Sequence, residues 1–93
     1  MPTMKLEIIT AESSIFSDDV EGLIAPGSQG ELGILPQHAA LMTALQSGEI
    51  SIRKQEGDVY MAVSGGFLEM MDNKVVILAD SAEKSEDIDE NRA

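Results

Sequence analysis

His38 is the single histidine of the chain and the first residue to consider as a centre of chemistry. A metal site would need several further ligands, and the chain contains no cysteine to supply a thiolate. A nucleophilic triad would need an activated hydroxyl and an orienting carboxylate, but the sequence contains no nucleophile-elbow pattern. We therefore predict no catalytic residue and no metal site. A small hydrolase centred on His38 stays open as an alternative.

The segment Ser64-Gly65-Gly66 could be interpreted as a phosphate cradle. A phosphate loop normally also has a lysine and the N-terminus of a helix behind it, and the sequence supplies neither at this point. Glycine equally relieves steric conflict where a strand bends. We predict a tight bend or bulge between Val63 and Phe67.

The overall composition excludes several classes of partner. Seventeen acidic residues against 6 basic ones give the 93-residue chain a formal net charge of -11, which repels nucleic acid and anionic lipid. No apolar run approaches the roughly 20 residues that span a bilayer, and the start of the chain lacks the pattern of a signal peptide. We expect one cytosolic domain, monomeric when isolated, with protein partners and no direct membrane insertion.

Apolar and polar residues alternate along much of the chain, which is the period of a strand with one buried face. Met4, Leu6 and Ile8 show this pattern, and so do Ile50 and Ile52. A short polar segment containing Gly57 then leads into Val59, Met61 and Val63, which predicts an antiparallel hairpin. Residues 67–71 and 74–79 repeat the arrangement around Asp72-Asn73.

Two further segments are less regular. Val20, Gly22 and Ile24 are predicted to share one side of a strand that Pro26-Gly27-Ser28 ends, because proline and glycine favour a reversal. Residues 39–45 are rich in good helix formers, so propensity alone favours a helical turn there.

Short strands joined by tight turns predict an all-β fold, a two-layer antiparallel β-sandwich. From Ser81 the composition becomes acidic, with Ile88 as the one large apolar residue. Asp80 and Glu83 resemble a helix-capping pair. We therefore divide the chain into a sandwich domain at 1–80 and an acidic tail at 81–93 that begins a helix.

Four segments of the chain form a recognisable set: Ile9 to Glu12, Gly27 to Ala39, Val63 to Glu69 and Val75 to Asp80. Together, and in this order, they are similar to the epsilon subunits of F-type ATP synthases. The resemblance implies a two-layer β-sandwich followed by two C-terminal helices, and it makes residues 39–45 mainly extended. Only the start of the helical region is expected in this sequence.

The resemblance further implies a non-catalytic rotor subunit of the central stalk, which couples ion translocation through the c ring to ATP synthesis. It would lie at the cytoplasmic face of the bacterial plasma membrane, in a peripheral complex. Its implied partners are the gamma subunit and the c ring. A short form would couple without the inhibition that the family's helices exert. A stand-alone β-sandwich module that binds a ligand or peptide is the alternative, since a fold does not determine a function.

The resemblance also assigns positions to these contacts. The c-ring contact falls on Gly30, Glu31, Leu32 and Gly33, and the gamma contact on Thr10, His38 and Ala39. Without the family, Glu31 would be interpreted as a solvated turn carboxylate. Gln37 and Ala40 stand where the family usually has a glycine and a proline.

The last residues are similar to a nucleotide-binding motif of some bacterial epsilon subunits. The matching positions are Glu83, Ile88, Asp89, Arg92 and Ala93. On a helix, Asp89 and Arg92 would share a face, where they could bind an adenine or ribose group and a phosphate. Because the family's remaining phosphate ligands lie in helices beyond this sequence, we expect no cofactor and no tight ATP binding.

Overall fold

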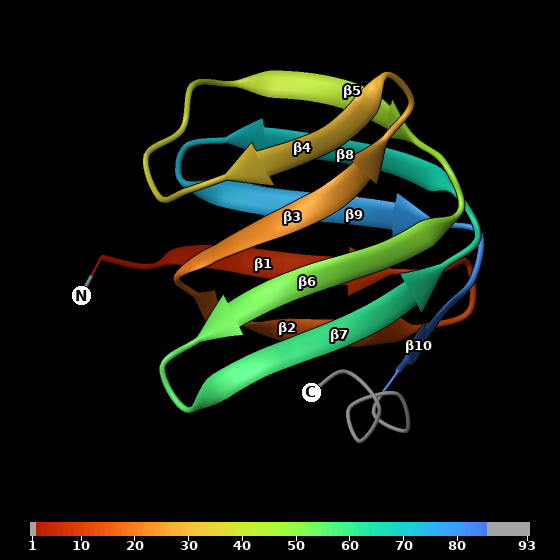
Figure 1. Cartoon of the computed structure of the whole chain (residues 1–93), viewed down its shortest axis with the longest axis horizontal. Coiled ribbons are helices and arrows are strands. Elements are labelled where there is room, and N and C mark those ends of the chain that lie inside the picture. The colour runs from red at the N-terminus through yellow and green to blue at the C-terminus, as the bar shows by residue number, and fades with distance from the viewer. Residues whose placement is uncertain (1, 86–93) are drawn as a thin grey trace.

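The computed structural model describes residues 2–85, and strands account for all of their regular structure (Figure 1). No helix that could cross a membrane occurs within this range. The strands are β1 (Met4–Ile9), β2 (Ser14–Val20), β3 (Gly22–Gly27), β4 (Gly30–Ile34), β5 (Leu41–Leu45), β6 (Gly48–Lys54), β7 (Gly57–Val63), β8 (Gly66–Met71), β9 (Lys74–Ala79) and β10 (Ala82–Lys84).

The strands form two layers, as the sequence predicts (Figure 1). One sheet, here called sheet A, has the order β4-β3-β6-β7-β10, and the other, sheet B, has the order β5-β8-β9-β1-β2. The layers join where β5 continues into β6, and Gly27 of β3 pairs with Leu45 of β5 at this corner. The Gln46 N–H donates to the Pro26 carbonyl over 2.9 Å and fixes the corner.

One strand pair departs from the antiparallel pattern. β1 pairs antiparallel with β2 on one side and parallel with β9 on the other, where Lys5 lies opposite Lys74 and Ile9 opposite Leu78. One edge of β1 forms the hairpin with β2. The other edge meets β9, whose direction is fixed by its antiparallel pairing with β8. The first strand of the chain therefore lies inside sheet B.

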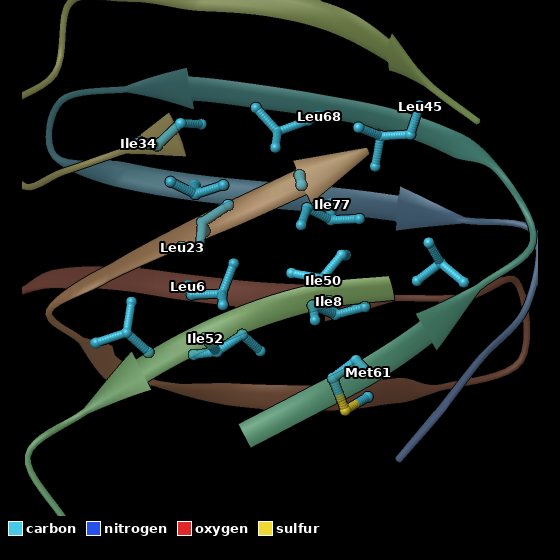
Figure 2. Packing of buried hydrophobic residues seen from close by; sticks show 14 of the residues in the cluster. Leu6, Ile8, Leu23, Ile34, Leu45, Ile50, Ile52, Met61, Leu68 and Ile77 are labelled. Atoms are coloured by element: carbon cyan, nitrogen blue, oxygen red, sulfur yellow. The ribbon is translucent and has the colours of Figure 1, made fainter. Parts of the chain in front are cut away.

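The core lies between the two sheets, where the inward residues of each strand meet (Figure 2). Side chains of β1 and β9 in sheet B face side chains of β3 and β6 in sheet A. The buried apolar cluster comprises Met4, Leu6, Ile8, Val20, Leu23, Ala25, Ile34, Leu45, Ile50, Ile52, Met61, Val63, Leu68, Met70, Val75, Ile77 and Ala79. Burying each large side chain of this kind contributes roughly 1.5–3 kcal/mol, so the alternation seen in the sequence stabilises both layers.

Both predicted hairpins are confirmed. β6 and β7 pair from Gly48 opposite Val63 to Lys54 opposite Gly57. β8 and β9 are joined by Asp72 and Asn73, whose φ angles of 53° and 61° both lie in the left-handed region. Two such residues are typical of a type I′ turn, whose twist matches that of the strands it joins.

The segment with helical propensity is extended, as the family resemblance implies. Leu41–Leu45 form β5, which pairs along its length with β8, from Leu41 opposite Met70 to Leu45 opposite Gly66. The ladder of hydrogen bonds to β8 and the burial of Leu45 outweigh the intrinsic preference of these residues for a helix.

The prediction that Val20, Gly22 and Ile24 share one side of a strand is wrong. Val20 is buried, but the chain bends at Glu21, whose N–H donates to the Arg53 carbonyl over 2.7 Å. The bend shifts the alternation by one residue, so Leu23 and Ala25 face the core. Ile24 is instead 47% exposed on the outer face.

The reversal after this strand also lies later than predicted. Pro26 stands inside β3, opposite Glu31, and the turn consists of residues 28 and 29. Proline has no N–H group, so a strand accepts it only where no ladder hydrogen bond is donated from that residue.

The beginning of the predicted tail is a strand rather than a helix. Residues 82–84 form β10, which pairs antiparallel with β7, so that Glu83 lies opposite Ala62. Ser85 is buried, and its N–H donates to the Tyr60 carbonyl over 2.9 Å. The capping role expected for Asp80 and Glu83 is therefore not found, and the remainder of the tail lies outside the described residues.

Candidate partner-binding surfaces

The turns of the sandwich gather at two opposite ends, which we name after Thr10 and His38 (Figure 1). The Thr10 end carries the turn after β1, the β3–β4 turn and the bend between β7 and β8. The His38 end carries the loop between β4 and β5 together with the β6–β7 and β8–β9 turns. Each predicted contact residue can be assigned to one end or to a strand between them.

The predicted c-ring segment forms β4, an edge strand that pairs only with β3 within the described part of the chain. Gly30 opens the strand with a φ of 124°, and Glu31 and Gly33 are exposed. Among residues 2–85, no basic side chain forms an ion pair with Glu31. Leu32, by contrast, packs against the core, so its side chain is less available to a partner than the other three positions.

His38 lies at the end of a turn formed by Leu35, Pro36, Gln37 and His38. The His38 N–H donates to the Leu35 carbonyl over 3.1 Å, and Gln37 has a φ of 69°. Proline at the second position and a positive φ at the third are the pattern of a type II turn, in which the third residue is usually glycine. Glycine takes this position without strain, which agrees with the glycine that the family resemblance implies where this chain has Gln37.

The His38 side chain is exposed, and its Nδ1 atom lies 2.8 Å from the Ala39 carbonyl oxygen. No serine, threonine or carboxylate is hydrogen-bonded to the ring within the described residues. The arrangement of a hydrolase is therefore not assembled around His38 in this part of the chain. Ala39, the neighbouring predicted contact, is also exposed.

Thr10 begins the turn between β1 and β2 at the opposite end. Its N–H donates to the Ser13 carbonyl over 2.9 Å, and its Oγ1 atom lies 3.3 Å from the same oxygen. β1 separates Thr10 from the His38 end, and six strand residues at about 3.3 Å each span roughly 20 Å. The structure thus does not bring Thr10 into contact with His38 and Ala39, but all three flank sheet B, since Thr10 follows β1 and Ala39 precedes β5.

The outer face of sheet B carries exposed apolar side chains that the sequence analysis missed. Cross-strand pairing places Ala44, Phe67, Leu78 and Ile9 in one row, and residues directly opposite in a sheet lie on the same face. The most exposed large members of this apolar face are Met42 at 70%, Phe67 at 57%, Leu78 at 54% and Met71 at 50%.

A signal for this face was present in the sequence. Residues 75–79 read Val-Val-Ile-Leu-Ala, an unbroken apolar run without the polar outer positions of a solvated strand. Strands that are apolar on both sides are typical of sheets covered on both faces. Only one of the two faces of β9 is covered here by the chain itself.

A second apolar surface is a groove of about 330 Å³ on the outer face of sheet A. Small residues at Gly22, Gly33 and Ser51 leave the hollow open. Ile24 and Leu35, which are 47% and 62% exposed, form part of its apolar lining, and Arg53 and Asp58 add opposite charges.

The glycine pair predicted to make a bend does so. Gly65 and Gly66 have φ angles of 120° and 143° between β7 and β8. A Cβ atom at Gly66 would overlap the carbonyl oxygen of Leu78. The glycines therefore allow two strands to approach closely, which accounts for them without a bound phosphate.

Comparison with known proteins identifies the family. The model of the ATP synthase delta/epsilon chain β-sandwich domain matches residues 3–85. The chain belongs to this ATP synthase family. The resemblance carried by the four sequence segments is thereby confirmed, and the matched range includes β10 as well as the strands before it.

Bacterial ATP synthase epsilon chains are similar over nearly the whole sequence. The epsilon chain of Dehalococcoides mccartyi is 53% identical over 93 residues, which are 100% of this chain and 66% of that protein. The epsilon chain of Pelotomaculum thermopropionicum is 48% identical over 98% of this chain and 68% of its own length. This member of the epsilon family thus spans about two thirds of these relatives.

Two solved assemblies contain chains with the same fold. A chain of the Euglena gracilis mitochondrial ATP synthase, in a structure of OSCP, F1 and the c-ring, superposes with a TM-score of 0.86 at 23% identity. The match covers 99% of this chain and 59% of the Euglena chain. A chain in a structure of the central stalk and c-ring of the Tetrahymena thermophila mitochondrial ATP synthase superposes with a TM-score of 0.76 at 18% identity. The match covers 96% of this chain and 72% of the Tetrahymena chain.

The predicted nucleotide motif of this epsilon-family chain is largely beyond the described range. Glu83 is exposed on β10, while Ile88, Asp89, Arg92 and Ala93 lie outside the described residues. Within residues 2–85, no group of three or more histidine, aspartate or glutamate side chains could hold a metal ion. The expectation that these residues bind no ATP tightly stays a prediction.

Proposed function

We propose that this chain is a non-catalytic rotor subunit of an F-type ATP synthase, which couples ion translocation through the c ring to ATP synthesis. The observation that carries the proposal is the family match over residues 3–85. The stiff two-layer sandwich suits the task, because a part that transmits torque must deform little and close-packed interiors have low compressibility.

The apolar outer face of sheet B is the proposed docking surface for the gamma subunit. An exposed apolar patch of this kind marks an interaction site in a soluble protein. Five strands about 4.8 Å apart and roughly 20 Å long give a face of about 500 Å², so a partner that buries the roughly 800 Å² per side of a standard interface would also contact the loops at both ends of the sheet. A partner that covers this face would reach Thr10 at one end and His38 and Ala39 at the other, which unites predicted contacts from opposite ends of the sandwich.

The β3–β4 hairpin is the proposed contact with the c ring. Glu31 is exposed there without an ion-pair partner in the described part of the chain, so it can pair with a basic group of another subunit. Gly30 and Gly33 have open space where a Cβ atom would lie, which lets a polar loop approach the backbone. This contact lies on sheet A, so it does not compete with docking at sheet B.

The proposal places the chain in a peripheral complex at the cytoplasmic face of the bacterial plasma membrane. Its similarity to bacterial epsilon chains supports the bacterial setting. The isolated chain would be a monomer, with its apolar face exposed until the gamma subunit covers it. It would need no cofactor, since the coupling role involves no bond-making step.

Calorimetric titration of the chain with the gamma subunit of the same synthase tests the docking surface. We expect Phe67→Asp to weaken binding by at least about 100-fold, because an exposed apolar residue of the docking face would become a buried charge in the complex. The matched control is Ile24→Asp, which places the same charge at an exposed apolar position of sheet A. Equal losses for both variants, or no binding by the unmodified chain, would contradict the proposal.

The groove on sheet A supports a second candidate, a stand-alone module that binds a small apolar ligand or peptide. Its volume of about 330 Å³ lies at the lower end of the range of ligand pockets. Binding of an apolar fluorescent probe that is abolished by Ile24→Asp, together with unchanged binding when Phe67→Asp is introduced, would favour this candidate.

A further inference from the structure

Asn73 connects three segments that are distant in the sequence. Its Oδ1 atom accepts the Gln37 N–H over 2.8 Å, and its Nδ2 group donates to the Thr3 carbonyl over 2.9 Å. Its own carbonyl oxygen accepts the Lys5 N–H over 3.2 Å. One turn residue of the β8–β9 hairpin thereby holds both the start of β1 and the loop between β4 and β5.

The loop it holds contains a strained residue. Gln37 has a φ of 69°, in the left-handed region where a side chain with a Cβ atom costs roughly 1–2 kcal/mol. Glycine would take this position of the turn without that cost. A hydrogen bond to the Gln37 N–H is therefore a direct means of keeping the turn in place.

We propose that Asn73 is a positioning residue, which fixes the Leu35–His38 turn and so sets the orientation in which His38 and Ala39 meet a partner protein. The inference rests on the proposed docking of the gamma subunit across sheet B. Asn73 is suited to this role because asparagine tolerates its own φ of 61° while both ends of its amide are used.

Hydrogen exchange on the isolated chain tests the positioning directly. Asn73→Gly keeps the left-handed backbone but removes both side-chain hydrogen bonds, and we expect exchange of the Gln37 amide to become about tenfold faster. Asn73→Asp keeps the acceptor and should leave this exchange nearly unchanged. The control is Asp72→Gly, because Asp72 also has a positive φ in the same turn, and within residues 2–85 its side chain forms no hydrogen bond to the loop.

Binding to the gamma subunit supplies the second measurement. We expect Asn73→Gly to weaken binding about five- to tenfold and Asp72→Gly to change it less than about twofold. Adding Gln37→Gly to Asn73→Gly should restore most of the affinity, because glycine adopts the turn without the hydrogen bond.

The two measurements separate the positioning role from the proposed function. If Asn73→Gly leaves Gln37 exchange unaltered, or weakens binding only as much as Asp72→Gly, the positioning role is wrong. If the unmodified chain does not bind the gamma subunit, the proposed function fails, while the exchange rates still decide whether Asn73 holds the turn.

Discussion

Lys54 of β6 and Asp18 of β2 form an ion pair between the two layers of the sandwich, with 2.6 Å between Nζ and Oδ2. The Lys54 ammonium also lies 5.8 Å from the centre of the Phe16 ring. Sheet A and sheet B are joined at one edge by the continuous chain from β5 to β6, and at the other edge β2 continues into β3 through Glu21. The ion pair lies beside this second junction and adds a polar link between the two sheets.

The ion pair predicts a specific loss of stability in acid. The hydrogen bond from Lys54, followed by one from the Asp19 N–H, holds the pKa of Asp18 below its usual value. Because the folded pKa is the lower one, the stabilisation is present above the unfolded pKa of about 3.9 and is lost as the pH falls through the folded pKa. Urea unfolding from about pH 2 to pH 7 should show a flatter profile for Asp18→Asn than for the unmodified chain.

Glu56→Gln is the matched control for this profile, because Glu56 lies 4.0 Å from the same ammonium and is more exposed. Its profile should follow that of the unmodified chain. If Asp18→Asn does so as well, the pair has no part in the acid response.

Gly66→Ala should destabilise the fold by more than about 3 kcal/mol, because a Cβ atom there would overlap the Leu78 carbonyl and the φ of 143° is poorly tolerated by alanine. Gly33→Ala is the control, since its added Cβ would meet nothing within 4 Å, and should cost less than about 0.5 kcal/mol. Urea unfolding of both variants measures the difference. Similar midpoints would show that β8 and β9 do not approach as described.

Ile77→Ala and Leu78→Ala test which face of β9 points into the core, because these adjacent residues lie on opposite faces of the strand. Ile77 is fully buried, so its truncation should cost about 2–5 kcal/mol, while Leu78 is 54% exposed and should cost less than about 1 kcal/mol. Binding to the gamma subunit should show the opposite order, with Leu78→Ala the weaker binder at temperatures where both variants are folded. The same order in both experiments would contradict the assignment of the two faces.

Gln37→Gly should raise the stability of the chain by about 0.5–1 kcal/mol, because relief of the left-handed backbone exceeds the entropy that glycine loses on folding. Gln37→Ala should give no gain, since alanine keeps the Cβ atom. Thermal unfolding of the two variants decides the matter, and equal midpoints would argue against strain at this turn.

The sequence predicts the strands wherever local pattern and turn chemistry agree. The alternation of Met4, Leu6 and Ile8 and the turn at Asp72-Asn73 depend on neighbouring residues alone, and both are found in the structure. Partners distant in the sequence decide the remainder. Glu21 bends because its N–H meets the Arg53 carbonyl, and residues 82–84 are extended because β7 offers a free edge.

The candidate surfaces likewise include features that local sequence predicts and features that depend on distant residues. Glu31 and His38 are both exposed in the structure, and the partners that the motifs imply for them stay proposals. The apolar face of sheet B exists only after pairing aligns Phe67 with Leu78 and Ala44, and the Asn73 contact with Gln37 spans 36 residues. No local pattern contains these relationships.

The parallel pairing of β1 with β9 has a consequence for synthesis of the chain. Lys5 emerges from the ribosome long before Lys74, its neighbour in the sheet, so β1 cannot complete both of its ladders until most of the chain has been made. Such distant pairing is typical of domains that fold in about milliseconds to seconds rather than microseconds. The face formed by β1, β8 and β9 is thus one of the last surfaces to mature, and subunit assembly through it would recruit only completed chains.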